Sequence, residues 1–432
     1  MLERSIAAVR RRANRPFLAS VGLVLLVLLG PNVQGDAVIA QTSSDESSLD
    51  AASDPTVRKA KFELAADYSA KFSGRAVLVM RKGEVIYERY DGWLATRPHM
   101  LASGTKSFTG VLAMFAAQEG LLSLDEKACD TITEWKGDER KREITIRHLL
   151  TLSSGLDPAD SAFPTRGEGL RRLGGVAQDR ADRIKRQDEK TGLSKLATGN
   201  WFKDSIRVPM KHNAGEMFEY GPSHFYAFGE LLNRKLGQHG EIKEKTFEGY
   251  ARSRIFEPLG ISIGWWGKDE AGNVNIPGGL FLTAREWAKF GQFVEQRGAW
   301  KQADGSMKQL LKSELLGQCF HPSATNKSYG LTWWLGGAAG EADAGRNEEA
   351  NQAQAMRQRL RQRMQEKAAV AEIAIGGKAV KIQMAAGLGK QRLFVIPDYQ
   401  LVVVRFAEPT REGQGFRDAE FLKPILETLS PR

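Results

Sequence analysis

Ser103-Gly104-Thr105-Lys106 brings a hydroxyl and an amine three residues apart, where the next residues predict the start of a helix. Residues i and i+3 share one face of a helix, so these two side chains can converge on one point. The amine can then accept the proton whose loss makes serine a nucleophile, which is the chemistry of acyl transfer. A structural alternative competes with this, in which Ser103 caps the helix and Lys106 is solvated.

The residues after Ser103 predict one helix that ends near Gly120, because glycine commonly stops helices. Its apolar residues are Phe108, Val111, Leu112, Met114 and Phe115. The N-terminus of a helix carries positive potential, which favours an oxyanion at Ser103 and disfavours the charged form of Lys106. The position therefore suits a nucleophile and its base.

Elements at both ends of the chain predict the fold. A hairpin is expected over residues 76–90 around Lys82-Gly83, two strands within 393–406, and a last helix over 416–429. We therefore predict an α+β fold. One antiparallel sheet is built from both chain ends and flanked by helices, with an inserted helical lobe at about 110–275.

Smaller signals predict where individual helices lie. A helix is expected from Val57, with Leu64, Tyr68 and Phe72 on its apolar face. Two residue pairs have the spacing of a capping box, which marks a helix start. They are Ser123 with Glu126 and Thr283 with Glu286.

Several segments resemble, in order, recurring segments of the serine beta-lactamase-like hydrolases. They lie at residues 144–156, 278–286, 329–334 and 387–397, and with the Ser-x-x-Lys segment they span nearly everything from about Gly74 to Phe406. This family includes class C beta-lactamases, D-alanyl-D-alanine carboxypeptidases, family VIII esterases and 6-aminohexanoate-oligomer hydrolases. The resemblance implies the same α+β sandwich, of the beta-lactamase/transpeptidase-like type.

The resemblance also implies a catalytic tyrosine at Tyr220, which matches the tyrosine of the family's Tyr-x-Asn motif. Pro222 stands at the asparagine position, so one amide donor is lost, and Ser223 or His224 are the candidates to replace it. A phenol with a pKa near 10 acts as a base only where cations lower that pKa, and Lys106 would be the nearby cation. The structural alternative is a core tyrosine with a satisfied hydroxyl.

The family's third motif, a Lys/His-Thr-Gly triplet, matches residues 385–387, where Ala385 supplies no cation. At residues 385–387 only the backbone can therefore contribute to the site. The resemblance implies that Gly387 permits close approach and that the amides of Leu388 and Ser103 form the oxyanion hole. It also places Trp334 at the wall of the site, which favours an apolar or extended substrate.

Charge and cysteine usage narrow the classes of function. Without residues 1–40 the net charge falls from +10 to +7, because five arginines are lost against one glutamate and one aspartate. This surplus is spread along the chain rather than concentrated in a run, so we predict no nucleic-acid partner. The six histidines have no metal-ligand spacing, and we predict neither a metal nor a cofactor. Cys129 and Cys319 are the only cysteines, and the sequence leaves open whether they pair.

The N-terminus predicts export. Arginines precede an apolar run over residues 17–29 and a small-residue site at 38–40, the order of a cleaved signal peptide over residues 1–40. The apolar run is shorter than the roughly 20 residues that a membrane span needs, although an uncleaved membrane anchor remains the alternative. We therefore expect a periplasmic or extracellular protein.

After the signal peptide we expect a tether at 41–56 and one hydrolase domain over 57–432. Two stretches of that domain, about 158–205 and 336–378, are predicted to be variable insertions. The second contains a Gln/Arg-rich segment of helix-forming residues. We interpret it as a solvated helix, and a lid or partner-binding role is the alternative.

Together these features predict an exported serine hydrolase. Ser103 attacks, Lys106 and Tyr220 transfer protons, and an ester or small amide is cleaved through an acyl-enzyme. A beta-lactamase or D-alanyl-D-alanine carboxypeptidase, with a peptide substrate, is one alternative. A catalytically weak binding protein on the same fold is the other, because two of the three motifs are degraded.

We expect the mature protein to begin near Gln41, because the apolar run is too short to span a membrane and is followed by a cleavage-like site. N-terminal sequencing of the protein purified from its native envelope measures this. A mature chain that still begins at or near Met1 would favour the anchored alternative.

Overall fold

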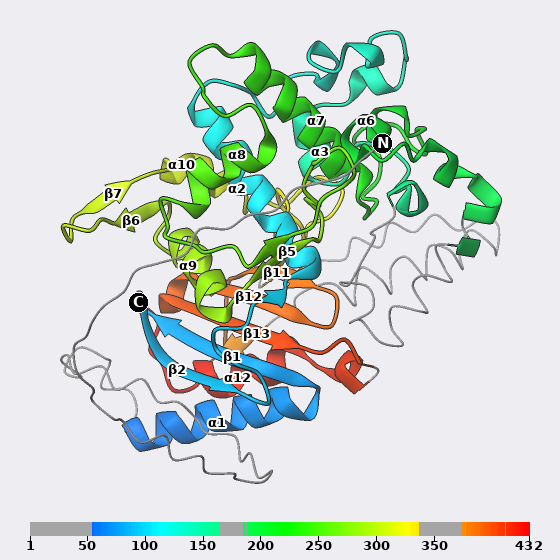
Figure 1. The fold of residues 1–432 in the computed structure, drawn as a ribbon. Helices are drawn as coiled ribbons and strands as arrows, with labels where there is room; N and C mark the ends of the chain where they lie inside the picture. Colours follow the sequence, from blue (N-terminus) through cyan, green and yellow to red (C-terminus); the bar gives the residue numbers. More distant parts are fainter. Residues whose placement is uncertain (1–53, 164–184, 187, 337–372, 376, 411) are drawn as a thin grey trace, which may run out of the picture. The chain divides into compact units, whose positions relative to one another are not determined.

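The computed structural model describes residues 54–163, 185–186, 188–336, 373–375, 377–410 and 412–432 (Figure 1). The predicted signal peptide and nearly all of the tether lie outside the described residues. So do residues 164–184 and 187 of the first predicted insertion and most of the second. Within the described part of the chain, no helix is both long and apolar enough to cross a membrane.

A six-stranded antiparallel sheet draws its strands from both ends of the chain (Figure 1). Its order is β2-β1-β13-β12-β11-β8. The bounds are β1 Gly74–Arg81, β2 Glu84–Tyr90, β8 Trp334–Gly336, β11 Ile382–Gly387, β12 Gln391–Ile396 and β13 Leu401–Ala407. The predicted α+β fold, with one sheet built from both chain ends, is confirmed.

The hairpin that joins β1 to β2 turns at the predicted residues. Lys82 and Gly83 have φ angles of +52° and +85°, which is the left-handed pair that a two-residue hairpin turn requires. The expected strands near the C-terminus are β12 and β13, joined by a short 3-10 turn over Pro397–Tyr399. The last helix, α12, covers Asp418–Leu426 and is shorter than predicted.

Helices cover both faces of the sheet, and β13 shows which face each one covers. Phe406 stacks on Trp287 of α9 (Ala284–Glu295), with ring centroids 5.6 Å apart. The adjacent Arg405 points the other way and donates to Ser69 Oγ (2.9 Å) and to the carbonyl of Phe72 (2.7 Å) at the end of α1 (Pro55–Lys71). Helices α1 and α12 therefore lie on one face and α9 on the other.

The predicted apolar face of α1 is right for Tyr68 and Phe72, which are partly buried against the core, and wrong for Leu64. Leu64 is 56% exposed, whereas the buried side chains are Phe62, Ala65, Ala66 and Ser69. The helix therefore turns small residues and one phenylalanine towards the sheet. The small residues let the helix approach closely, which the four-residue spacing of Leu64, Tyr68 and Phe72 does not indicate.

The helical lobe lies between β2 and β11 in the sequence, with short strand pairs at its margins. The helices are α2 Lys106–Gln118, α3 Ile146–Leu150, α6 Trp201–Arg207, α7 Ser223–Gln238, α8 Phe247–Ala251, η8 Arg252–Phe256 and α10 Ser313–Gln318. The short strands are β3 His99–Met100, β4 Trp265–Trp266, β5 Leu280–Leu282, β6 Ala299–Lys301, β7 Met307–Gln309, β9 Ala374–Ile375 and β10 Lys378–Ala379.

The two capping-box pairs have different outcomes. Thr283 caps α9 and accepts a hydrogen bond from the amide of Glu286 (3.2 Å), as predicted. Ser123 donates its amide to the Glu126 carboxylate (2.9 Å), yet no helix begins there, so this prediction is wrong. The side-chain bond stabilises a turn instead.

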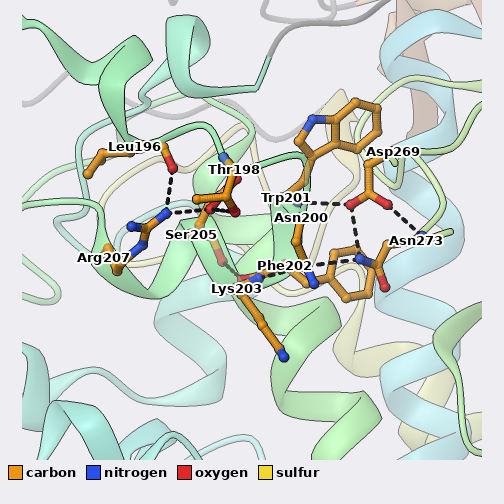
Figure 2. Close-up of polar contacts among 11 residues, drawn as sticks. Leu196, Thr198, Asn200, Trp201, Phe202, Lys203, Ser205, Arg207, Asp269 and Asn273 are labelled. Atoms are coloured by element: carbon orange, nitrogen blue, oxygen red, sulfur yellow. Dashed lines mark hydrogen bonds and ion pairs between the residues drawn. The ribbon is translucent and has the colours of Figure 1, made fainter. Parts of the chain in front are cut away.

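Two aspartates fix α6 within the lobe (Figure 2). Asp204 is fully buried and accepts from the amide and the hydroxyl of Thr198 (2.8 and 2.6 Å). Asp269 accepts from the amides of Trp201 and Asn273 (both 2.8 Å), which joins the start of α6 to a distant loop. These bonds hold α6 in place against α7.

Helix α2 passes so close to the loop after α10 that Gly110 has no room for a side chain. A Cβ at this position would lie 2.3 Å from the carbonyl oxygen of Leu331. We expect Gly110→Ala to lower the free energy of unfolding by about 1–3 kcal/mol, the usual effect of overpacking a core. Urea denaturation measures this.

Gly237→Ala is the matched control, because Gly237 also lies in a helix but no atom lies within 4 Å of a Cβ placed there. It should leave stability unchanged or raise it slightly, since alanine favours helices over glycine. Equal losses in the two variants would contradict the close approach at Gly110.

Candidate active site

Ser103 lies in a strained turn just before α2. It is part of a 3-10 turn, Ala102–Thr105, and Ala102 before it has a φ angle of +49°, in the left-handed region. The residue at the N-cap position of α2 is Thr105, whose hydroxyl donates to the carbonyl of Ala102 (2.8 Å). The structural alternative, in which Ser103 serves as a helix cap, is therefore wrong.

The side chain of Lys106 is buried and in contact with Ser103. Its Nζ donates to Ser103 Oγ (3.0 Å) and to the backbone carbonyl of Pro277 (2.6 Å), and only 5% of the residue is exposed. The alternative of a solvated lysine is therefore also wrong. Burial costs an amine its hydration, which these two oxygen partners offset.

Tyr220 lies beside this pair with its ring facing the amine. Lys106 Nζ lies 4.9 Å from the centroid of the Tyr220 ring and 5.3 Å from that of Phe225. Because Tyr220 is 39% exposed, it is not the core tyrosine of the structural alternative. The three residues Ser103, Lys106 and Tyr220 therefore lie together, and Tyr220 is open to solvent.

Trp334 supports the ring of Tyr220. The two rings stack with centroids 6.1 Å apart, and Trp334 is only 8% exposed. Tyr329 meets Trp334 edge to face at 4.8 Å and is fully buried, which raises the pKa of its phenol well above the usual value. Among Tyr220, Tyr329 and Trp334, the ring of Tyr220 is therefore the exposed one, and most of Trp334 is covered.

The backbone at Gly387 approaches the Ser103 turn closely. A Cβ at Gly387 would lie 2.1 Å from the carbonyl oxygen of Leu101, so only glycine lets β11 pass at this distance. Among the described residues, no hydrogen bond occupies the amides of Ser103 or Leu388. Both amides are therefore free to bind an oxygen of a substrate.

The site lacks the cation of the family's third motif. Ala385 is fully buried, opposite Leu393 in the sheet, so its methyl group is part of the core. The cations close to Ala385 in the sequence, which could replace the missing charge, are Lys381, Lys390 and Arg392. Arg392 is no substitute, because its Nε pairs with Asp418 Oδ1 (2.9 Å) on the α12 side of the sheet. This guanidinium is thus directed away from Ser103.

His224 lies near this site, and its hydrogen bonds could not be predicted from the sequence. Its Nδ1 lies 2.8 Å from Ser154 Oγ, and its Nε2 lies 2.7 Å from the backbone carbonyl of Glu219. Both nitrogens are occupied, so His224 cannot replace the amide lost at Pro222, and Ser223 is fully buried as well. Neither predicted substitute reaches a substrate.

The cysteines and metal-ligating residues form no second site. Cys129 and Cys319 are free and buried, and burial raises the pKa of the Cys319 thiol. Within the described ranges, no group of three or more His, Cys, Asp or Glu side chains is arranged to hold a metal ion.

Comparisons with known proteins agree on one family. A family model described as Beta-lactamase matches residues 60–423. The lovastatin esterase of Penicillium rubens is 30% identical over 182 residues, 38% of this chain and 38% of that protein. The chain thus matches well under half the length of this curated relative.

Solved structures show the same fold. A 6-aminohexanoate-dimer hydrolase from Bacillus anthracis has a TM-score of 0.52 at 18% identity and covers 84% of this chain and 79% of its own. An octameric penicillin-binding protein homologue from Pyrococcus abyssi has a TM-score of 0.54 at 15% identity and covers 86% and 78%. The predicted beta-lactamase/transpeptidase-like type of the fold is thereby confirmed.

The buried ring of His224 makes stability depend on pH. Burial lowers the pKa of His224 to about 4 from an ordinary 6.5. The unfolded chain therefore binds a proton that the folded protein excludes, so stability is complete above about pH 6.5 and falls as the pH drops towards 4.

We expect His224 to contribute a loss of about 2 kcal/mol in the free energy of unfolding between pH 7.5 and pH 5. Urea denaturation of the wild type and of His224→Gln, which cannot titrate, measures this contribution. His99 and His148 also have lowered pKa values, so the variant should reduce the pH dependence without abolishing it. Identical pH dependence in the two proteins would contradict it.

Proposed function

Because this chain belongs to the beta-lactamase family, we propose that it is an exported serine hydrolase that cleaves an uncharged ester or a small amide through an acyl-enzyme. One observation carries the proposal, the contact of 3.0 Å between Lys106 Nζ and Ser103 Oγ in a place where the lysine is buried. A general base must lie within hydrogen-bond reach of the proton it removes, and this amine does.

The reaction begins when Ser103 Oγ attacks the substrate carbonyl and its proton passes to Lys106 Nζ. An unprotonated amine can keep an N–H bond to the carbonyl of Pro277 while its lone pair accepts that proton. The amides of Ser103 and Leu388 stabilise the oxyanion as it forms. These two donors are backbone groups and do not depend on the side chains that the family motif has lost.

The second half of the reaction needs a proton at the leaving atom. Tyr220, with its ring 4.9 Å from Lys106 Nζ and partly exposed, delivers it from the amine side. The leaving alcohol or amine departs, and Ser103 holds the acyl group as an ester. Water then attacks that ester by the same route in reverse, and the acid is released.

The substrate preference results from the missing charge. A carboxylated substrate finds no cation at Ala385 and no amide at Pro222, and Arg392 is paired with Asp418. An uncharged ester needs only the nucleophile, the proton relay and the two amides. The similarity to the Penicillium lovastatin esterase supports an ester, and that to the 6-aminohexanoate-dimer hydrolase an amide.

A beta-lactamase or D-alanyl-D-alanine carboxypeptidase is the second candidate, favoured by the fold shared with the penicillin-binding protein homologue. A binding protein without turnover is the third. The intact Ser103–Lys106 contact disfavours it, because a binding protein has no use for a buried base beside a serine.

We expect kcat/KM for p-nitrophenyl acetate or butyrate to exceed that for nitrocefin by about tenfold or more, since each lost charge-assisted contact costs about 1.5–3 kcal/mol. Steady-state kinetics of residues 41–432 on both substrates and on D-alanyl peptides measures this. Faster turnover of nitrocefin than of the esters would return the enzyme to the beta-lactamase class.

Ser103→Ala is the control in the same assay. It should abolish turnover and fluorophosphonate labelling while leaving the fold intact, because the Ser103 hydroxyl caps no helix. Activity above about a tenth of wild type would reveal another nucleophile. Absence of both turnover and labelling in the wild type would support the binding protein.

A further inference from the structure

The residue before Tyr220 is held at each of its polar groups. Glu219 donates its amide to the carbonyl of Leu152 (2.8 Å), and its carboxylate accepts from Lys211 Nζ (2.9 Å) and His212 Nε2 (3.3 Å). Its carbonyl accepts from His224 Nε2 (2.7 Å). A surface loop rarely fixes one residue this completely, so the position of Glu219 constrains the neighbouring Tyr220.

The contacts of His224 define which nitrogen carries the proton. A carbonyl oxygen only accepts hydrogen bonds, so Nε2 must donate to Glu219. The neutral ring then accepts at Nδ1 from the hydroxyl of Ser154 (2.8 Å), which itself accepts from the amide of Leu156 (3.3 Å). The bonds therefore run in one direction, from Leu156 through Ser154 and His224 to the carbonyl of Glu219.

The segment over residues 152–158 forms a template for the loop that carries Tyr220. Besides Leu152 and Ser154, the carbonyl of Ser153 accepts from the amide of Gly215 (2.8 Å). Gly221 packs on Pro158 so closely that a Cβ at Gly221 would lie 2.4 Å from the Pro158 Cβ. The loop is thus held on both sides of Tyr220.

We propose that His224 is a positioning residue, which directs the phenol of Tyr220 to the proton-transfer site by holding the carbonyl of Glu219. The proposal rests on the proposed function, in which Tyr220 transfers the proton to the leaving atom. Tyr220 and Phe225 lie at the two ends of the turn that His224 anchors. The ring centroids of both residues lie near Lys106 Nζ, at 4.9 and 5.3 Å respectively. A shift of the Glu219 carbonyl would therefore move Tyr220 relative to Lys106.

Two further observations support this role. Tyr220 is 39% exposed, so packing covers only part of its ring and the backbone on either side contributes to its direction. His224 is fully buried, and burial lowers its pKa, so the ring stays neutral and keeps the donor at Nε2 over the pH range in which most hydrolases are assayed.

Three variants test the proposal through the kinetics of hydrolysis of an alkyl ester, ethyl butyrate, whose alkoxide must be protonated as it leaves. The rate of fluorophosphonate labelling at Ser103, where fluoride leaves without a proton, is the second measurement. His224→Met replaces the ring with an apolar side chain that cannot donate a hydrogen bond. His224→Gln retains an N–H donor on a side chain of similar length. Phe228→Leu alters another fully buried side chain of α7, one that has no polar group to hydrogen-bond to Glu219, and serves as the control for stability.

We expect His224→Met to lower kcat for ethyl butyrate by about tenfold or more with KM changed less than about twofold, because small misplacements of a reacting group cost rate rather than binding. The labelling rate should change less than about twofold, because it depends on Ser103 and Lys106 alone. His224→Gln should recover most of the activity. Phe228→Leu should keep wild-type kcat at a similar loss of thermal stability. A Gln variant as slow as the Met variant would overturn the proposal, since the ring would then serve packing alone.

A double-mutant cycle decides whether His224 acts through Tyr220. In a Tyr220→Phe background, His224→Met should cause no further loss of kcat, because the group it positions is gone. The same fold-loss in both backgrounds would overturn the proposal. Wild-type kcat in His224→Met, with Tyr220→Phe slow, would overturn it while leaving the proposed function intact.

Full activity of Tyr220→Phe would instead show that the proposed function fails at the proton-transfer step, and the role of His224 with it. If His224→Met does not fold, Ser154→Ala removes the group that orients the ring. It should lower kcat by about threefold, and that loss should be absent in the Tyr220→Phe background. A loss that persists there would count against the proposal.

Discussion

The structure around the site depends on one constraint, the burial of an amine against a hydroxyl. Lys106 is nearly inaccessible to water, so its Nζ needs oxygen partners within the protein, and it finds Ser103 Oγ and the carbonyl of Pro277. These come from two segments far apart in the sequence. The left-handed φ of Ala102 fits the same constraint, because the chain must turn sharply to present Ser103 to the amine.

Much of the fold could be predicted from the sequence, because its signals are local. The hairpin at Lys82-Gly83 and the helix that ends near Gly120 depend on residues within a few positions of each other, and both are present. The exposed position of Leu64 on α1 and the absent helix at Ser123 have the opposite cause. There, packing against distant elements and a side-chain bond within a turn outweigh the local pattern.

Some contacts of the candidate site could likewise be predicted from the sequence, and others could not. Ser103 and Lys106 are three residues apart, so their convergence could be predicted from the sequence. The place of Tyr220 beside them could be predicted from the family resemblance. The carbonyl of Pro277 has no sequence signal, since every residue has a carbonyl. The contact of His224 with Ser154 joins residues 70 positions apart, which spacing cannot indicate.

The order of strands in the sheet bears on when this protein becomes active during its synthesis. Strands β11, β12 and β13 come last in the chain, yet β13 pairs with β1 at the centre of the sheet and Leu388 comes directly after β11. A nascent chain that already contains Ser103 and Lys106 therefore lacks both the completed sheet and Leu388, whose amide is the second oxyanion donor of the proposed mechanism. If Ser103 is the nucleophile, as proposed, its reactivity would therefore be complete only after the C-terminal strands have joined the sheet.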